Sequence, residues 1–279
     1  MIISKIIGGL GNQLFQYAVG KAASLHHNVP LKLDILNYET YNLHNGFRLD
    51  QFSAEFQIAT ETEVEQFKGK SDLIGKINRK LGLKKPYLKE VQNNTFQTSV
   101  FSSNQLYLDG YWQNEKYFKQ ISDNLVADFK VKKDFIFSNK KFRQEVCKNQ
   151  SVGIHVRRGD FLKHPDIGVL SLQYYRRAVS YIQDRVEKPT FYLFSDDLNW
   201  CRTNLDFIDN AVFVDQTKSE LDDFQLMQEC KHNIIANSSF SWWAAWLNQN
   251  SDKIVVAPKR WMASQPPGCK WALDDWIEF

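Results

Sequence analysis

Two adjacent arginines close an apolar stretch of strand length in the second half of the chain. The stretch 151–156 (SVGIHV) predicts a strand, and the run HVRRGD at 155–160 carries Arg157 and Arg158 out of it. A guanidinium stays charged at any physiological pH, so two of them at a strand end need anionic partners. Strand alternation places His155 and Arg157 on one face and Arg158 on the other. The partners are either carboxylates of the chain, Asp160 among them, or a diphosphate that Arg157 grips through paired hydrogen bonds.

Polar residues follow a second apolar stretch as well. Ser195, Asp196 and Asp197 come directly after the run TFYLF at 190–194. Carboxylates at this point could accept hydrogen bonds from the N1 and N2 atoms of a guanine base. They could equally cap the helix that follows, because Asp is a favoured N-cap residue.

A third strand, loop and helix run through 234–243. The loop holds Ser238 and Ser239, and Phe240 follows them. Serine hydroxyls beside the free amides of a helix N-terminus make a seat for phosphate. The alternative is simple N-capping by one of the serines, with Trp242, Trp243 and Trp246 packed as core.

A glycine turn follows the first predicted strand, at 2–7. Gly9-Leu10-Gly11 begins like a dinucleotide fingerprint, but the third glycine is missing and no P-loop lysine follows. We expect Asn12 to cap a helix over 13–25. The turn either lets backbone approach a ligand, with Asn12 and Gln13 at the edge of a cleft, or only allows close packing.

Metal and cofactor signals are missing from the sequence. No D-x-D triplet occurs, and the cysteines at 147, 201, 230 and 269 are scattered, with no histidine at metal-ligand spacing. We therefore expect no metal and no cofactor, and free thiols that are buried. Without a metal, arginine has to neutralise a phosphate leaving group.

The bulk composition excludes several classes of protein. The formal net charge is +3 over 279 residues, which argues against a dedicated nucleic-acid binder. No run approaches the roughly 18 to 20 apolar residues of a membrane span, and the N-terminal apolar runs lack the pattern of a signal peptide. We expect a soluble cytoplasmic protein, with loose association to the inner membrane face as a further option.

The elements that must position these residues alternate in type. Short apolar stretches alternate with helical ones, which is typical of parallel sheets covered on both faces. We predict an α/β fold with two Rossmann-like domains facing across a cleft, at 1–145 and 146–279, joined near the polar stretch 138–150. Lys-rich residues in 67–90 have helical character. Further strands are expected at 31–35, 106–108, 211–214, 233–236 and 253–257, and helices at 172–186, 220–231 and 240–247.

Five motifs together resemble the α-1,2-fucosyltransferases of glycosyltransferase family 11. They occur in that family's order and span most of the chain: IGGLGNQLFQYA at 7–18, DGYWQ at 109–113, HVRRGD at 155–160, FSDD at 194–197 and NSSFSWW at 237–243. The resemblance implies a GT-B-type fold and a GDP-fucose donor bound mainly by the C-terminal domain. It also implies inversion at the anomeric carbon without a metal, in the assembly of cell-surface polysaccharide.

The same resemblance implies roles for single residues. Arg157 would bind the β-phosphate and stabilise the departing GDP, with Arg158 and Asp160 as further catalytic residues and His155 in the donor site. Asp160 is either the base or a residue that orients the arginines. Asp196 and Asp197 would contact guanine or ribose, and Ser238, Ser239 and Phe240 would line the GDP pocket. Asn12 and Gln13 would reach the donor across the cleft, and Tyr111 and Trp112 would lie on the acceptor side. The short N-terminus lacks the membrane anchor of animal members, which indicates a bacterial or viral type.

Several alternatives stay open at this point. The α-1,6 and protein O-fucosyltransferases share the His-x-Arg pattern, and a non-catalytic nucleotide-sugar or glycan-binding protein could keep the fold. The acceptor, predicted as a terminal β-galactoside that is free or lipid-linked, is not specified by the sequence. Neither is the general base.

Overall fold

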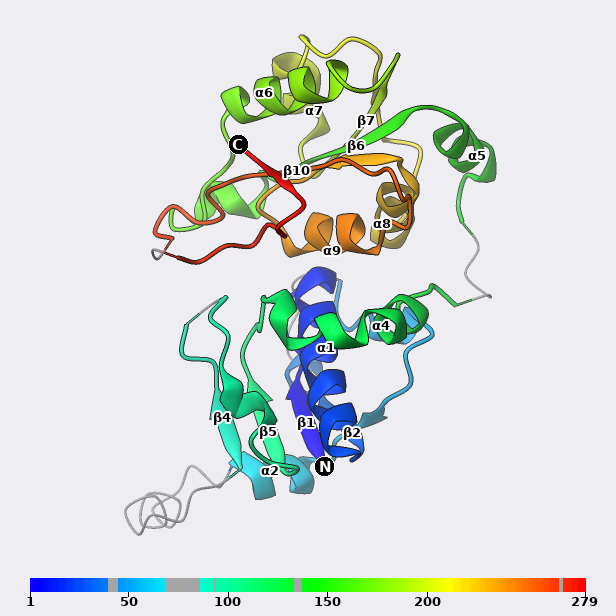
Figure 1. The fold of residues 1–279 in the computed structure, drawn as a ribbon. Helices are drawn as coiled ribbons and strands as arrows, with labels where there is room; N and C mark the ends of the chain where they lie inside the picture. The colour runs from blue at the N-terminus through cyan, green and yellow to red at the C-terminus, as the bar shows by residue number, and fades with distance from the viewer. Residues whose placement is uncertain (40–44, 69–85, 93, 133–136, 266–267) are drawn as a thin grey trace. The chain divides into compact units, whose positions relative to one another are not determined.

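The structure is a computed structural model, and it describes residues 1–39, 45–68, 86–92, 94–132, 137–265 and 268–279. The chain divides into two compact units, Met1–Phe135 and Ile136–Phe279 (Figure 1). The predicted boundary after residue 145 lies within a helix of the second unit, α5 (Lys140–Lys148). Each unit is described by itself below.

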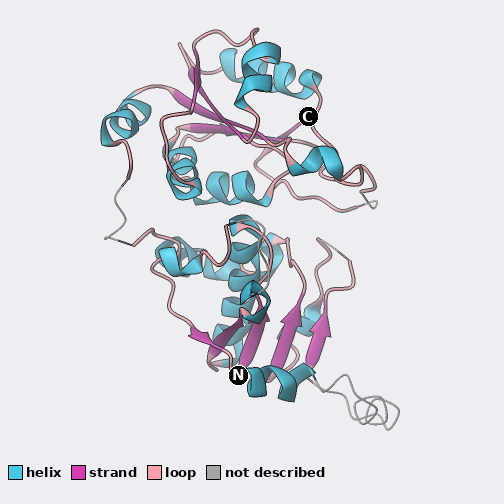
Figure 2. Cartoon of the chain, turned by 180° about the vertical axis from the view of Figure 1, so that it is seen from behind, coloured by secondary structure: helices cyan, strands magenta, loops and turns pink. Residues whose placement is uncertain are grey.

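The first unit is built on a parallel sheet with the strand order β3-β2-β1-β5-β4. In Figure 2 the strands of this sheet run side by side in one direction. Its central strand β1 carries Ile2 and Ile3, which are fully buried. The described strands are β1 (Ile2–Lys5), β2 (Leu31–Asp34), β3 (Gln57–Ile58), β4 (Tyr87–Lys89) and β5 (Leu106–Asp109).

The helix after the glycine turn begins earlier than its sequence predicts. Helix α1 runs over Leu10–His27, with Gly9 as N-cap and Asn28 as a left-handed C-cap at φ 52°. The predicted stripe of Leu14, Ala18 and Ala22 is buried, but Leu25 is 45% exposed. Two further α-helices of the described part of this unit are α2 (Glu61–Lys68) and α4 (Ser122–Asp128), and several short 3-10 helices lie between the strands. Most of the Lys-rich segment 67–90 lies outside the described residues.

The second unit holds a larger parallel sheet, with the strand order β11-β10-β9-β6-β7-β8. The central strand β6 is buried at all six positions, which is why it reads as a continuous apolar run rather than an alternating one. The predicted strands are confirmed to within a few residues. They are β6 (Ser151–Val156), β7 (Thr190–Ser195), β8 (Ala211–Phe213), β9 (His232–Ile234) and β10 (Val255–Ala257). The edge strand β11 (Ile277–Glu278) was not predicted.

Helices cover both faces of this sheet, as predicted. Figure 1 shows α6 and α7 on one face and α8 and α9 on the other. Val152, Ile154 and Val156 of β6 pack with α6 and α7 in a single apolar core. The tryptophans of α9 are core residues, because Trp242 and Trp243 are 1% and 0% exposed. These helices are α6 (Leu172–Gln183), α7 (Leu198–Asn204), α8 (Glu220–Glu229) and α9 (Ser239–Leu247).

The polar stretch 138–150 was expected to be a junction, and this is wrong for most of its length. It forms α5, which buries Phe142 and Val146 and is capped by the Asn139 side chain, which accepts from the amide of Phe142 at 3.1 Å. The Arg143 guanidinium donates from Nε to Glu229 of α8 at 2.7 Å. Only two apolar residues per two turns face the core, which is too sparse a pattern to have predicted a helix.

The cysteines match the predicted burial only in part. All four cysteines are free thiols, but only Cys201 and Cys230 are buried, while Cys147 is exposed. Among the described residues, no helix combines the length and apolarity that a membrane span requires.

Helix α8 carries an unusual carboxylate near its start. Asp223 accepts a hydrogen bond from the Thr217 hydroxyl at 2.7 Å, and burial raises the pKa of Asp223 from 3.8 to about 6. The neighbouring charges of Asp222 and Glu220 add to this rise. Ionising Asp223 at neutral pH therefore costs stability.

The substitution Asp223→Asn tests this cost. Between pH 3.8 and 6 the folded chain retains a proton that the unfolded chain releases, so the free energy of unfolding falls as pH rises through this window. Asn does not ionise. The free energy of unfolding of the variant minus that of the wild type should therefore be up to about 3 kcal/mol larger at pH 7 than at pH 3.5. Urea unfolding at a series of pH values measures it. A variant-minus-wild-type difference that is constant with pH would contradict the assignment.

Candidate functional site

Three neighbouring strands of the second unit end at one edge of its sheet. Strand β6 lies between β9 and β7, and all three are parallel. Their carboxyl ends bring together the segments 155–160, 195–197 and 235–240. Ligands of open α/β sheets bind at this edge, and the sequence predicted that these segments meet.

Arg157 is held by two carboxylates. Its Nη2 lies 2.8 Å from Asp160 Oδ1, and its Nε lies 3.2 Å from Asp196 Oδ2. The guanidinium also lies over the ring of Phe161, 5.5 Å from its centroid. The side chain is 28% exposed, so it is fixed in direction and still accessible.

Arg158 points to a different set of partners, as strand alternation predicted. Its Nε lies 3.3 Å from Asp197 Oδ2, and its guanidinium stacks over Trp200 at 3.8 Å from the ring centroid. Asp197 also caps α7 by accepting from the amide of Trp200 at 3.1 Å. The capping alternative therefore holds for Asp197, and Trp200 is a partner that the sequence did not indicate.

Asp196 connects the two strand ends. Its Oδ1 accepts from the backbone amide of Arg158 at 2.9 Å, while its Oδ2 pairs with Arg157. A Cβ built on Gly159 would lie 2.7 Å from that Oδ2. Glycine at 159 thus leaves the space that the Asp196 carboxylate occupies, which explains the residue type between the arginines and Asp160.

His155 is buried beneath this charged cluster. It is 6% exposed, its ring centroid lies 5.6 Å from that of Phe240, and its Nδ1 has no hydrogen-bond partner among the described residues. Burial, and secondly the charge of Arg157, lowers the pKa of His155 from 6.5 to about 3. The imidazole is therefore neutral at physiological pH.

The N-terminus of α9 is open. Ser238 occupies the N-cap position but its side chain makes no capping hydrogen bond, so the capping alternative is wrong for this serine. Ser238, Ser239 and Phe240 are all partly exposed. The first-turn amides and two hydroxyls are thus available to an anion, and the helix dipole adds partial positive charge.

The glycine turn of the first unit is also an uncapped helix start. Gly9 is the N-cap of α1 and Asn12 lies inside the first turn, so the prediction that Asn12 caps the helix is wrong. Gly8 has φ +79°, and a Cβ there would meet Asn12 Nδ2 at 2.9 Å. Asn12 Oδ1 accepts from Gln113 Nε2 at 2.8 Å. The side-chain nitrogen of Asn12, Nδ2, can still donate a hydrogen bond beside the turn.

Gln13 stabilises the turn instead of facing solvent. It is fully buried, and its Nε2 donates to the carbonyls of Gly8 and Gly46, both at 2.9 Å. Its Oε1 accepts from the amide of Arg48 at 2.8 Å. The predicted contact of Gln13 with a donor does not fit this position, because every polar atom of its amide is already bonded to backbone.

The sequence did not indicate one further residue at the glycine turn. The hydroxyl of Tyr38 donates to the Gly8 carbonyl at 2.7 Å. The turn is thus fixed from several sides by side chains that lie far apart in the chain.

The loop after β5 does not present Trp112 to a ligand. Trp112 is fully buried, in a left-handed backbone conformation at φ 56°, so its predicted acceptor role does not fit, whereas Tyr111 is partly exposed. Glu90 Oε2 holds this loop by accepting from the amides of Tyr111 and Trp112, at 2.6 and 3.1 Å. Burial raises the pKa of Glu90 despite these bonds.

Taken together, the edge of the second sheet presents several groups that could contact an anion. It offers a fixed arginine, a second arginine beside it and an uncapped helix N-terminus. Carboxylates of the chain, Asp160 and Asp196, hold Arg157 in the structure. Within the described ranges, no three His, Cys, Asp or Glu side chains come close enough together to hold a metal ion.

Comparison with known sequences gives a family match. The sequence model described as Glycosyl transferase family 11 matches residues 76–277. The chain is 34% identical to an alpha-1,2-colitosyltransferase of Escherichia coli, over 94% of this chain and 92% of that protein. It is 32% identical to the O-antigen biosynthesis glycosyltransferase WbnK of Escherichia coli, over 98% and 99% of the two chains. A 113-residue region is 39% identical to galactoside alpha-(1,2)-fucosyltransferase 1 of Leontocebus fuscicollis, covering 38% of this chain and 31% of that protein.

Solved structures of fucosyltransferases share the fold. NodZ α-1,6-fucosyltransferase co-crystallised with GDP superposes with a TM-score of 0.51 at 13% identity, covering 87% of this chain and 90% of that one. A mutant of Arabidopsis thaliana FUT1 in complex with GDP gives 0.53 at 11% identity, covering 91% and 69%. These likenesses, with the two parallel sheets, place the chain in the GT-B-type α/β fold predicted from its sequence.

The neutral state of His155 gives a testable pH dependence. The unfolded chain takes up a proton at this site as pH falls below 6.5, whereas the folded chain does so only near pH 3. As pH falls through this window, the wild-type free energy of unfolding therefore falls by about 1.4 kcal/mol per pH unit, because only the unfolded chain binds the proton. Subtracting the wild-type value from that of His155→Phe should expose this slope between pH 6 and 4 in urea unfolding. A flat difference would mean that the imidazole titrates normally.

The close approach at Gly159 predicts a coupling with Asp196. Gly159→Ala should lower the free energy of unfolding by about 1 to 3 kcal/mol, because the new methyl group overpacks the carboxylate. In an Asp196→Ala background the same change should cost under about 1 kcal/mol, since the obstructing atom is gone. A double-mutant cycle in urea measures the coupling, and purely additive costs would contradict the contact.

Proposed function

The chain belongs to glycosyl transferase family 11, and on that premise we propose that it is an inverting α-1,2-fucosyltransferase. In this proposal it moves L-fucose from GDP-β-L-fucose to the 2-hydroxyl of a terminal β-galactoside without a metal ion. The observation that carries the proposal is the position of Arg157, accessible and fixed by Asp160 and Asp196 at the carboxyl edge of the sheet.

Arg157 suits the β-phosphate of the donor. A guanidinium binds phosphate through paired hydrogen bonds, and its carboxylate partners keep it in place before the donor arrives. When the diphosphate binds, its oxygens take over part of the charge that Asp160 and Asp196 now neutralise. Arg158 adds a second positive charge, held by Asp197 and Trp200. No D-x-D triplet occurs to bridge a metal to the diphosphate, so arginine supplies the neutralisation.

The open start of α9 supplies further contacts to the phosphates. Its amides and the hydroxyls of Ser238 and Ser239 are placed beside the arginine segment by the neighbouring strands β6 and β9. Helix N-termini stabilise anions through free amides and the dipole. The uncapped start of α1, with the Asn12 amide nitrogen beside it, offers the same chemistry in the first unit.

The transfer follows from these contacts. The acceptor oxygen forms a bond to C1 of fucose as the bond from C1 to the β-phosphate oxygen breaks, and the electron pair of that bond leaves with GDP. Negative charge develops on the phosphate, where Arg157 is already directed, so the transition state gains more than the ground state. Displacement from the opposite face inverts β to α. Asp160 acts as a positioning residue for Arg157, and the acceptor proton passes to water, because the departing phosphate lies on the opposite face of C1.

The relatives support the linkage and leave a second donor to test. The two relatives named for their linkage, the colitosyltransferase and the galactoside fucosyltransferase, are both α-1,2 enzymes by name. Colitose is the 3-deoxy counterpart of fucose, and the colitosyltransferase matches 94% of this chain. A GDP-colitose donor is therefore the second candidate. The two donors differ by a single hydroxyl, so the GDP contacts proposed above serve both.

The test is acceptor-dependent GDP release from each donor. Wild-type protein is incubated in EDTA with GDP-fucose or GDP-colitose and a panel of β-galactosides that includes lactose. We expect release that needs a galactoside, persists in EDTA and yields an α-1,2-linked product by NMR. Arg157→Ala should lower turnover by about 10² to 10³-fold, the usual cost of losing a preorganised charge donor in a transition state.

A matched variant controls for charge loss. Arg176→Ala removes an arginine that stacks on Phe207, 3.9 Å from its ring centroid, on α6, and it should keep wild-type turnover. Binding of GDP-fucose without any turnover, unchanged in Arg157→Ala, would favour a non-catalytic binding protein. Preference for GDP-colitose would select the second candidate, and a product of another linkage would overturn the α-1,2 assignment.

A further inference from the structure

The loop after β5 is held on both sides of Gln113. Before it, Trp112 is fully buried, and the amide of Trp112 donates to Glu90 Oε2 at 3.1 Å. After it, the Asn114 side chain donates from Nδ2 to the Asn94 carbonyl at 2.8 Å. The Asn114 amide also donates to the Trp112 carbonyl at 2.8 Å, so Gln113 is the central residue of a tight three-residue turn. The backbone of Gln113 is therefore fixed in place.

A buried glutamine joins this loop to the glycine turn of the same unit. Gln16 of α1 is fully buried, and its Nε2 donates to the Gly110 carbonyl at 3.2 Å. Its Oε1 accepts from the amide of Ile7, just before the turn, at 2.9 Å. The segments that follow β1 and β5 are thus bonded to one side chain. This fixes the position of the loop with respect to the turn.

Gln113 bonds to the oxygen of the Asn12 side chain. Its Nε2 donates to Asn12 Oδ1 at 2.8 Å. Asn12 is the third residue of α1, a position from which a side-chain oxygen can bond back to the start of its own helix. In α1 the oxygen bonds to the distant loop instead. The bond occupies the acceptor atom of the Asn12 amide and leaves the two N–H donors of Nδ2.

The Nδ2 atom of Asn12 is accessible and unused. Asn12 is partly exposed, and within the part of the chain that the structure describes its Nδ2 is neither buried nor hydrogen-bonded. It lies against Gly8, because a Cβ built on that residue would come within 2.9 Å of it. Gly8 also has a positive φ of +79°, which favours glycine. The turn therefore leaves the space that the Asn12 amide occupies.

Packing alone does not decide which atom of this amide faces outward. The oxygen and the nitrogen of an asparagine amide exchange places in a half-turn that leaves its shape almost unchanged. The bond from Gln113 does decide it, because the N–H donor of Gln113 requires the oxygen of Asn12 as its partner. The orientation matters for a phosphate, whose oxygens accept hydrogen bonds from Nδ2 and are repelled by Oδ1.

We propose that Gln113 is a positioning residue for Asn12. It holds the Asn12 amide with Nδ2 outward, where this atom donates to a phosphate oxygen of the nucleotide-sugar donor. The inference rests on the proposed function, in which the start of α1 contacts the donor phosphates. It adds a residue that acts through Asn12 without touching the donor itself. Glu90 and Gln16 support the loop that carries Gln113, so the amide is oriented before the donor binds.

Calorimetric titration of the full chain with GDP tests this role, because GDP carries both phosphates and needs no turnover. Asn12→Ala should weaken GDP binding by about tenfold, the usual cost of a lost hydrogen bond to a charged group. Gln113→Met removes the bond to Oδ1 at a similar volume and should weaken GDP binding by about three- to tenfold. In an Asn12→Ala background, Gln113→Met should change the affinity by less than about twofold, since the residue it positions is gone.

A change of donor to acceptor at residue 113 is the sharper variant. Gln113→Glu offers only acceptor oxygens, so it accepts from Asn12 Nδ2 and turns Oδ1 outward. It should weaken GDP binding by more than about tenfold, and most of this loss should disappear in the Asn12→Ala background. The loss that persists there measures the repulsion between the new charge and the phosphates. Gln105→Met, at an exposed glutamine before β5, makes the same substitution as a control and should keep the wild-type affinity.

Several outcomes would overturn the inference. Gln113→Met within about twofold of wild type would mean that Asn12 needs no positioning. Additive losses in the double variant would mean that Gln113 acts on the ligand or on the fold directly. Coupling between the two residues in urea unfolding, without coupling in GDP affinity, would reduce their bond to a structural one.

Arg157→Ala, titrated in parallel, separates this inference from the proposed function. Loss of GDP binding in Arg157→Ala, with no effect of Asn12→Ala, would keep the donor assignment and overturn the role of Gln113. GDP binding that is unchanged in Arg157→Ala, yet weakened by Gln113→Met only when Asn12 is present, would overturn the proposed donor edge and keep the positioning role.

Discussion

The charge of two adjacent arginines at the end of a buried strand is the constraint from which the rest of the site follows. Strand β6 is buried along its whole length, and the two guanidinium groups that follow it are only partly exposed, at 28% and 15%. Opposite charges must therefore come from neighbouring elements. Asp196 and Asp197 come from the end of β7, and Asp160 comes from the turn after β6 itself. The strand order is what brings these carboxylates within reach.

The same constraint accounts for local features that look unrelated. Gly159 is small because a Cβ would meet the Asp196 carboxylate. His155 stays neutral because it is buried next to a cation. Trp200 on α7 covers Arg158 with its ring face. Each is a consequence of placing positive charge at this edge and holding it still.

The sequence predicted the second unit well, and the reasons are physical. Its central strands are continuous apolar runs and its longer helices have a clear stripe, as in 220–231, where Leu221, Phe224 and Met227 are all buried. Edge strands such as β3 and β11 have two residues each, which is too short to show a pattern. Helix α5 was missed because few of its residues are buried.

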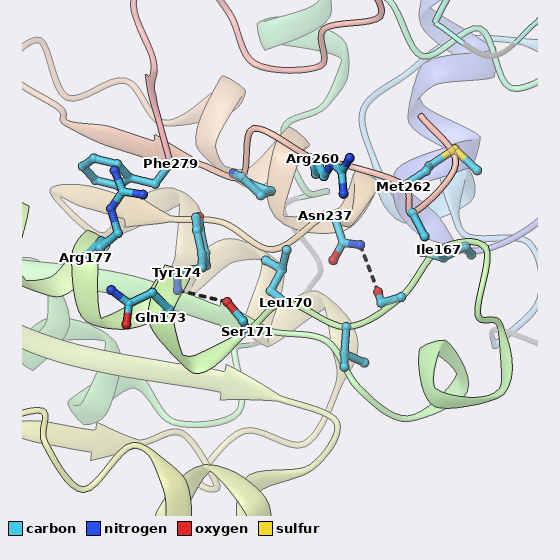
Figure 3. A pocket seen from close by; sticks show the side chains of 14 residues that line it. Ile167, Leu170, Ser171, Gln173, Tyr174, Arg177, Asn237, Arg260, Met262 and Phe279 are labelled. Atoms are coloured by element: carbon cyan, nitrogen blue, oxygen red, sulfur yellow. Dashed lines mark hydrogen bonds between the residues drawn. The ribbon is translucent and has the colours of Figure 1, made fainter. Parts of the chain in front are cut away.

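Side-chain detail was less predictable than the placement of segments. The burial of Gln13 and Trp112 depends on partners distant in the chain, such as Arg48 and Glu90, and no local pattern reveals these pairings. The N-terminus of α9 shows the same limit. A serine at an N-cap predicts a capping bond from residue type alone, and here the bond is not made. A pocket beside α6, shown in Figure 3, takes its walls from the segments after β9 and β10 and from the C-terminal Phe279, and only the folded chain brings these together.

The pairing of Arg157 with Asp160 and Asp196 also bears on turnover in the proposed reaction. These carboxylates are tethered to the backbone a few ångströms from the guanidinium, so their effective concentration is far above that of any free nucleotide. Once the sugar has been transferred, the carboxylates of Asp160 and Asp196 compete with GDP for the Arg157 guanidinium. The ion pairs that position Arg157 for the donor therefore also favour departure of the product, and a single arrangement of charges serves both ends of the catalytic cycle.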